Sequence, residues 1–289
     1  MNDFQCNICQ GRDAVFYCRK DSIDVFSCRN CGHKYVNGAP NYKEMEGHYS
    51  QEYFQPYIKS EDTHLRKRFK KRIAEIKKIR FPGVLLDAGC GAGTFLKLAQ
   101  DEGYKAFGVE LSRWACEYAS NNFCLDVYNG DLKGAPYLPE TFDVITLWHV
   151  LEHINDPKSL LARAHKLLKP KGLLALEVPN IASLPAKISG VDWELMAPKE
   201  HFSYFSPRAI EMLLEYSGFR ILKQQSYLWT TPAMFFKAQA KKSGRYMQLI
   251  LRLAAALSRI FSFLRFRAMP DFLKGDIITV YAVKVEGSL

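Results

Sequence analysis

The sequence predicts an α/β protein built on a doubly wound, mostly parallel sheet, preceded by a small cysteine-rich module. Three observations support this fold class. Short apolar segments alternate with helical patterns from residue 84 onward, as in βαβ units. The run 84–96 joins an apolar strand, an acid and three alternating glycines to the start of a helix. Four cysteines within the first 31 residues form two C-x-x-C pairs.

The glycine loop consists of Gly89, Gly91 and Gly93, with the spacing G-x-G-x-G. Glycines ahead of a helix allow the backbone to approach a bound cofactor closely. This spacing differs from the dinucleotide motif G-x-G-x-x-G, because Thr94 stands where the third glycine of that motif would be. A nicotinamide dehydrogenase is therefore disfavoured. The alternative is a loop whose glycines only turn the chain. Acids at several strand ends favour a nucleoside site instead.

Polar residues follow the carboxyl ends of the predicted strands. Asp87 ends the first strand, and Glu110 ends the second, 19 residues after Gly91. That offset is usual for a carboxylate that binds ribose hydroxyls. Asp131 and Trp148 follow the next two strands, and ligands of parallel sheets bind at this edge. The predicted strands are 84–86, 105–110, 124–128, 142–147, 173–178, 220–227 and 277–283.

These segments resemble the class I S-adenosylmethionine-dependent methyltransferases over roughly residues 80–230 and the final strand. The resemblance rests on Asp87–Gly93, Gly108–Ser112, Gly130–Leu132, Phe142–Ile145 and Leu168–Gly172, in that order. It implies a Rossmann-like methyltransferase sheet with an antiparallel last strand and S-adenosylmethionine as cofactor. By this resemblance the glycine loop holds the methionine part, Glu110 the ribose, and Asp131 with Leu132 the adenine. Trp148 would lie near the sulfonium, and Asp87 and Leu111 would be further cofactor contacts.

The N-terminal pairs Cys6-x-x-Cys9 and Cys28-x-x-Cys31 predict a zinc ribbon. Each pair directs two thiolates at one point, and two pairs complete a tetrahedron. So short a segment cannot bury enough core to fold alone, so the prediction includes a structural metal. An iron centre would use the same ligands. A closed four-thiolate site has no open position for chemistry, which leaves a structural role or a docking surface.

A second set of candidate residues follows the strand at 142–147. His149, Glu152 and His153 have helical spacing, and His201 follows the strand at 173–178. This pattern resembles the ubiquinone-biosynthesis O-methyltransferases and the small-RNA 3′-end 2′-O-methyltransferases. Those carry Glu-x-x-Glu-His plus a distant histidine, and the RNA enzymes hold a divalent metal with these groups.

This sequence departs from that pattern, because His149 stands where the first glutamate would be. Three imidazoles and one carboxylate suit a second divalent metal such as zinc, manganese or iron better than magnesium. One alternative is that Glu152 and His153 only bond to backbone. Another is a histidine general base, for which His149 and His201 are favoured over His153.

Basic residues gather in two segments of this chain, whose net charge is +10. Residues 66–80 hold nine of the 40 lysines and arginines against one acid, Glu75, and residues 237–267 hold eight more and no acid. The first segment has a helical apolar stripe, and its basic residues are expected on the other faces. Those faces are either solvated or in contact with an anionic substrate or membrane.

The predicted organisation has three parts. They are a zinc ribbon over 1–40, a helical arm over 41–80, and a class I methyltransferase domain over 81–289 with a helical insertion at about 230–275. Residues 245–267 place arginines on one stripe of an otherwise apolar helix. Such a helix either lies on a membrane surface or packs on the domain or on a dimer partner.

The sequence therefore predicts O-methylation of a small-molecule or lipid-linked acceptor. C-methylation of a nucleotide sugar, known from related zinc-ribbon methyltransferases, is an alternative. An RNA methyltransferase fits the charge but not the absence of an Asn/Asp-Pro-Pro-aromatic motif or of a recognisable RNA-binding domain. A non-enzymatic platform is disfavoured by the intact acids of the cofactor site. The first residues resemble no signal peptide and no apolar run is long enough to span a membrane, so we expect a cytoplasmic protein, with peripheral contact at the inner face of the membrane.

Overall fold

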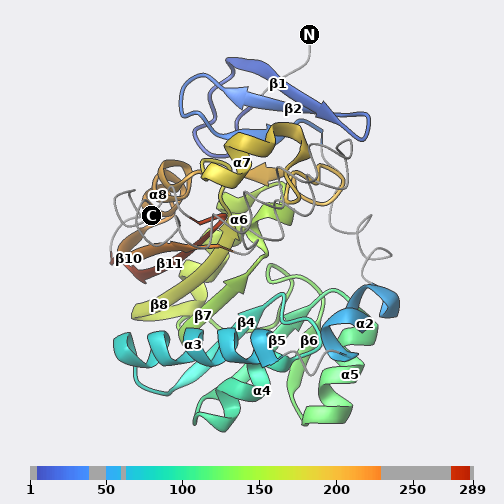
Figure 1. The fold of residues 1–289 in the computed structure, drawn as a ribbon. Coiled ribbons are helices and arrows are strands. Elements are labelled where there is room, and N and C mark those ends of the chain that lie inside the picture. Colours follow the sequence, from blue (N-terminus) through green and yellow to red (C-terminus); the bar gives the residue numbers. More distant parts are fainter. Residues whose placement is uncertain (1–4, 39–49, 60–62, 229–274, 287–289) are drawn as a thin grey trace, which may run out of the picture.

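A computed structural model describes residues 5–38, 50–59, 63–228 and 275–286. Within them the strands form a seven-stranded and a four-stranded sheet (Figure 1). Most of the predicted insertion, including the whole stretch 245–267, lies outside these residues. No helix of the described ranges is long and apolar enough to cross a membrane.

The larger sheet has the order β10-β11-β8-β7-β4-β5-β6. The five neighbouring strands β8, β7, β4, β5 and β6 pair in parallel, while β11 is antiparallel to both of its neighbours. This confirms the predicted mostly parallel sheet with an antiparallel last strand. Its members are β4 (Val84–Ala88), β5 (Lys105–Glu110), β6 (Asp126–Asn129), β7 (Phe142–Trp148), β8 (Leu168–Pro179), β10 (Phe219–Tyr227) and β11 (Ile277–Lys284).

Helices cover both faces of this sheet because each presents an apolar stripe to it. Ile73, Phe95 and Ala119 belong to the core on one face, and Leu161 and Leu213 to the core on the other. Figure 1 shows α3, α4 and α5 together on the first side. The helices are α2 (Gln51–Lys59), α3 (Thr63–Ile79), α4 (Thr94–Asp101), α5 (Arg113–Phe123), α6 (Pro157–Leu167), α7 (Leu184–Ser189) and α8 (Pro207–Tyr216), with 3-10 turns η2 (Leu151–His153) and η3 (Gly190–Asp192).

Two strands begin two or more residues away from the predicted position. β6 begins at Asp126 because Cys124 caps α5 in the left-handed conformation, with φ 53°. β8 begins at Leu168 rather than Leu173, because Leu168 already pairs with Phe142 ahead of a register shift.

The smaller sheet joins the N-terminal module to a distant segment. Its order is β1-β2-β3-β9, formed by β1 (Ala14–Lys20), β2 (Ile23–Cys28), β3 (Lys34–Val36) and β9 (Ser203–Tyr204). Cys6, Ile8 and Tyr35 belong to the same core cluster as residues of the larger sheet. The module therefore shares the core of the whole chain, which agrees with the prediction that so short a segment cannot bury enough core alone.

The helix α3 buries the predicted apolar stripe, including Ile73 and Ile76. The expectation that its basic residues all lie on other, open faces is wrong for Arg72, whose exposed fraction is 4%. Arg72 forms an ion pair with Glu177 of β8. A buried arginine needs such a partner, because an unpaired charge in the core would be costly.

Candidate functional site

The glycine loop connects β4 to α4 with three residues in the left-handed region. The φ angles are 77° at Gly89, 53° at Gly91 and 82° at Gly93. A Cβ on Gly89 would lie 2.6 Å from Val150 Cγ2, and one on Gly91 would lie 3.3 Å from Phe54 of α2. Both backbone angle and space therefore require glycine here. Phe54 places α2 directly against this loop.

Glu110 stands at the carboxyl end of β5, beside the glycine loop. Its Oε2 accepts a hydrogen bond from the Gly91 amide at 2.9 Å, and its Oε1 accepts one from the Ser112 amide at 2.9 Å. Burial raises the pKa of this carboxyl group. Each carboxylate oxygen retains a lone pair for a further donor. The carboxylate is thus held rigidly next to the loop.

Asp87 lies one residue before the end of β4 and is almost fully buried. The Thr146 hydroxyl donates to its Oδ1 at 2.6 Å. Burial raises the pKa of Asp87 to about 7, against the opposing effects of Thr146 and Arg72. Trp148, at the end of β7, has the Arg72 guanidinium 4.5 Å above its ring. Its indole Nε1 is buried and has no hydrogen-bond partner among the described residues.

The remaining predicted cofactor residues lie at the ends of β5 and β6. The Leu111 carbonyl accepts from the Asn129 side chain at 2.8 Å, which joins the two strand ends. Asp131 accepts from the Gly134 amide at 2.7 Å, and Leu132 is buried. All nine predicted cofactor residues therefore follow the carboxyl ends of adjacent strands, where parallel sheets bind ligands.

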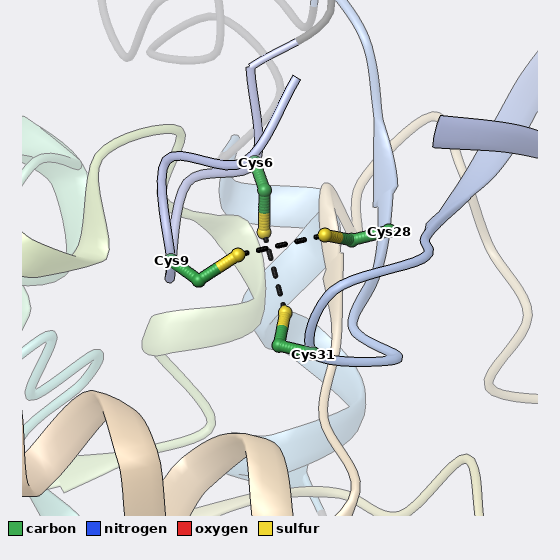
Figure 2. A group of neighbouring side chains, drawn as sticks. All are labelled: Cys6, Cys9, Cys28 and Cys31. Atoms are coloured by element: carbon green, nitrogen blue, oxygen red, sulfur yellow. Dashed lines mark hydrogen bonds between the residues drawn. The ribbon is translucent and has the colours of Figure 1, made fainter. Parts of the chain in front are cut away.

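The four ribbon cysteines direct their sulfur atoms at one point (Figure 2). Sγ–Sγ distances are 3.6 Å for Cys6–Cys31 and 3.5 Å for Cys9–Cys28. A tetrahedral zinc site with Zn–S bonds of about 2.3 Å places its sulfurs about 3.8 Å apart, so the group fits zinc. The neighbouring Cys31 thiol lowers the pKa of Cys6 to about 5, which favours a thiolate at this position.

Three of the four predicted acceptor-side residues meet in a second cluster. One ligand atom from each of Glu152, His153 and His201 lies within 4.8 Å of the others. His153 Nδ1 donates to the Glu200 carbonyl at 2.9 Å, and His201 Nδ1 donates to the Leu195 carbonyl at 2.8 Å. Because a carbonyl can only accept, both rings keep their Nε2 lone pairs available as ligands.

The carboxylate of this cluster is buried, with an exposed fraction of 1% for Glu152. Its Oε2 has no hydrogen-bond partner among the residues that the structure describes. A buried carboxylate oxygen without a partner is costly, and a cation would satisfy it. Glu152, His153 and His201 therefore fit a divalent metal of nitrogen and oxygen preference.

His149 takes a different position from that predicted. It precedes the turn η2 with φ 57°, rather than sharing a helical face with the cluster. Its Nδ1 lies 3.2 Å from Glu152 Oε1, and its Nε2 lies 3.7 Å from Glu177 Oε2. Burial, with Arg72 and Arg68 nearby, lowers its pKa to about 3. His149 thus connects the two carboxylates and is not a member of the three-residue ligand group.

Comparison with known proteins agrees with this geometry. A family model described as a methyltransferase domain matches residues 61–224. The chain belongs to the methyltransferase-domain family. A SAM-dependent methyltransferase from Thermotoga maritima superimposes with a TM-score of 0.54 at 18% identity, covering 80% of this chain and 98% of that one. A second, from Archaeoglobus fulgidus, gives 0.53 at 20% identity over 80% and 98%. At these identities the likeness shows the fold.

Sequence relatives of this methyltransferase-domain protein carry one recurring name. The ubiquinone biosynthesis O-methyltransferase of Schizosaccharomyces pombe is 36% identical over 99 residues, which are 32% of this chain and 36% of that protein. The enzyme of the same name from Coxiella burnetii is 25% identical over 185 residues, 60% of this chain and 79% of its own length. The alignments with the Schizosaccharomyces pombe protein and with the protein of the same name from Vibrio atlanticus thus span less than half of those relatives, 36% and 40%.

The sequence analysis missed a buried polar network in the methyltransferase domain. Glu177 Oε2 accepts from Arg72 and from the Tyr227 hydroxyl at 2.9 Å, and its Oε1 accepts from Thr279 at 2.9 Å. The available signal was an acid inside the apolar strand β8, since buried acids need partners. Nothing in the sequence pattern showed that the partner would be Arg72.

Proposed function

We propose that this protein is an S-adenosylmethionine-dependent methyltransferase that methylates a hydroxyl oxygen of a small-molecule acceptor. The observation that carries the proposal is the position of two sites at one edge of one sheet. The glycine loop with Glu110 follows β4 and β5, and the Glu152 cluster follows β7. The family match and the relatives named O-methyltransferases support the same reading of the site.

On the cofactor side, the glycine loop would hold the methionine part and Glu110 the ribose hydroxyls. Asp131 and Leu132 would enclose the adenine, with Leu111 beside it. The buried Nε1 of Trp148 supports a polar group next to its ring. Bound S-adenosylmethionine supplies an electrophilic methyl group, and the rigid hydrogen bonds of Glu110 hold the binding site in place beforehand.

On the acceptor side, Glu152, His153 and His201 would hold a divalent cation, which lowers the pKa of a hydroxyl bound to it. The carbonyls of Glu200 and Leu195 fix the ring orientations that this requires. We assign acceptance of the hydroxyl proton to His149; burial lowers its pKa to about 3, so the ring is unprotonated but a weak base, and the transfer depends on the lowered pKa of the bound hydroxyl. His149 would thus accept a proton, while Glu152, His153 and His201 would orient the acceptor.

The proposal also gives each part of the chain a role. The ribbon at 1–40 would bind structural zinc through four cysteines, the arm at 41–80 would cover the glycine loop through α2, and the remainder would form the catalytic domain. The contact of Phe54 with Gly91 supports the role of α2. The residues of the proposed membrane contact, 245–267, lie outside the described ranges, and a lipid-linked acceptor stays an alternative to a free small molecule.

The test is transfer of radiolabel from S-adenosylmethionine to an extract of the source cells, separated into lipid, RNA and soluble small-molecule fractions. We expect label in the soluble fraction, released by reagents that cleave methyl ethers. Label in lipid would identify a lipid-linked acceptor, and label in RNA would overturn the substrate class. Stable C-methyl label would favour a carbon acceptor. No label with bound cofactor would contradict the enzyme assignment.

Metal analysis tests the acceptor-side cluster separately. The wild type should contain zinc for the four thiolates plus one further divalent metal. Glu152→Gln should lose the further metal and at least ten-fold in turnover, while keeping the cysteine-bound zinc and cofactor affinity. A Glu117→Gln variant is the matched control, because Glu117 is exposed and pairs with Arg113 on α5, away from the cluster. Equal metal content in both variants would contradict the proposed cation site.

A further inference from the structure

The ribbon and the acceptor-side cluster are joined through one short segment. Residues 201–205 begin with His201 and continue into β9, which is the fourth strand of the ribbon sheet. Tyr35 of β3 pairs with Ser203, and the Val36 amide donates to the Phe202 carbonyl at 2.9 Å. The strand that follows the second cysteine pair therefore holds the backbone that carries His201.

The same segment is bonded to the other half of the cluster. The Phe202 amide donates to the carbonyl of Glu152 at 2.7 Å. One residue thus links β3 on one side to the turn η2, which carries Glu152 and His153, on the other. The spacing between Glu152 and His201, which no local sequence rule fixes, depends on this bond and on its neighbours.

A side chain inside the first cysteine knuckle completes the connection. Asn7 lies between Cys6 and Cys9, and its amide nitrogen donates to Ser203 Oγ at 2.9 Å and to the Asn155 carbonyl at 3.4 Å. Ser203 is two residues beyond His201, and Asn155 is two residues beyond His153. Asn7 therefore contacts both segments that carry the imidazoles.

Apolar packing reinforces these polar contacts. The ring of His33, two residues after Cys31, lies 5.2 Å from the ring of Phe205, and both side chains are fully buried. The Phe205 carbonyl accepts from the Ile181 amide at 3.0 Å, just beyond β8. The segment 201–205 is thereby enclosed between the ribbon and the end of the central sheet.

We propose that the four-cysteine ribbon is a positioning element for the Glu152, His153 and His201 cluster, with Asn7 as its principal positioning residue. A docking appendage would meet the catalytic domain through its surface. This ribbon instead contributes the strand β3, a knuckle side chain and part of the core. Metal bound by the cysteines orders the knuckle and β3, and so sets the distance between the cluster residues. The inference rests on the proposed function only for its catalytic consequence.

The test compares Asn7→Ala with Arg19→Ala in the full-length, zinc-loaded protein. Arg19 is exposed and paired with Asp24 on the β1–β2 hairpin. Arg19→Ala therefore changes the ribbon without removing the contacts made by Asn7. Hydrogen exchange at the Phe202 amide is the principal readout, with amides of β4 as an internal reference. Loss of the Asn7 hydrogen bonds should speed exchange at Phe202 about five-fold in Asn7→Ala and leave Arg19→Ala unchanged.

Two further readouts separate positioning from simple loss of the ribbon. The zinc-to-protein ratio should be the same in both variants, and Asn7→Ala should lower kcat with little change in the KM for cofactor. If Asn7→Ala loses zinc, Ser203→Ala removes the same hydrogen bond from the catalytic side and replaces it in the comparison. Unchanged Phe202 exchange in these variants would overturn the inference. Because exchange requires no turnover, it decides the inference even if no methyl transfer is found.

Discussion

The cofactor side and the acceptor side of this sheet edge are built in different ways. The glycine loop and Glu110 occupy consecutive β–α junctions, and the contact between them joins residues 19 positions apart. The acceptor-side cluster brings together residues from η2 and from the segment before β9, held by a ribbon almost 200 residues away in the chain, as the Asn7–Ser203 bond shows. Local motifs suffice for the first site. The second depends on long-range packing, and should respond more strongly to distant changes.

Arg72 lies where the two sides meet, and its loss should produce the largest effect. It pairs with Glu177, lies over Trp148, and influences the charge of Asp87. Arg72→Met would leave the Glu177 carboxylate buried without its cation. We expect the free energy of unfolding to fall by about 3–5 kcal/mol, measured by urea denaturation.

The double variant Arg72→Met/Glu177→Gln separates an uncompensated charge from lost packing. The oxygen of a neutral amide at position 177 can accept from one of the Tyr227 and Thr279 hydroxyls, and its NH2 group can donate to the other, so most of the lost stability should return. A double variant as unstable as Arg72→Met alone would show that Arg72 acts through its packing with Phe69 and Trp148 instead.

Glu110 tests whether the cofactor side is as self-contained as its local construction indicates. Glu110→Ala removes two charge-assisted hydrogen bonds to the loop backbone together with the proposed ribose contact. We expect S-adenosylhomocysteine to bind about 100-fold more weakly in calorimetry, with unchanged metal content at both clusters. Asp101→Ala, at an exposed i,i+4 pair on α4, is the control and should bind normally. A change in metal content would show that the two sides are coupled.

The same contrast explains what the sequence could predict. The mostly parallel sheet, the tight glycine turn and the four-cysteine group follow from short patterns in which a residue type and its spacing imply the geometry. The addition of β9 to the ribbon and the pairing of Arg72 with Glu177 join residues more than 100 positions apart. The sequence pattern does not distinguish Arg72 from the other eight basic residues of 66–80. Only the packing of the core shows that Arg72 is buried. The sequence predicted a helical turn that includes His149. The left-handed backbone of His149 instead places the start of the turn at Leu151.

Asp87 offers the smallest and most specific test, through the pH dependence of cofactor binding. Its pKa is raised to about 7 in the ligand-free protein, so half of the molecules carry a neutral Asp87 near pH 7. The positively charged ammonium group of S-adenosylhomocysteine would favour the ionised form of Asp87. Affinity for S-adenosylhomocysteine should therefore rise about ten-fold between pH 6 and pH 8 and then level off. The raised pKa also means that ligand-free stability falls as pH increases from about 4 to 7, because the unfolded chain loses its proton first. Asp87→Asn should flatten both profiles. A binding profile that stays steep in Asp87→Asn would assign the titration to another group.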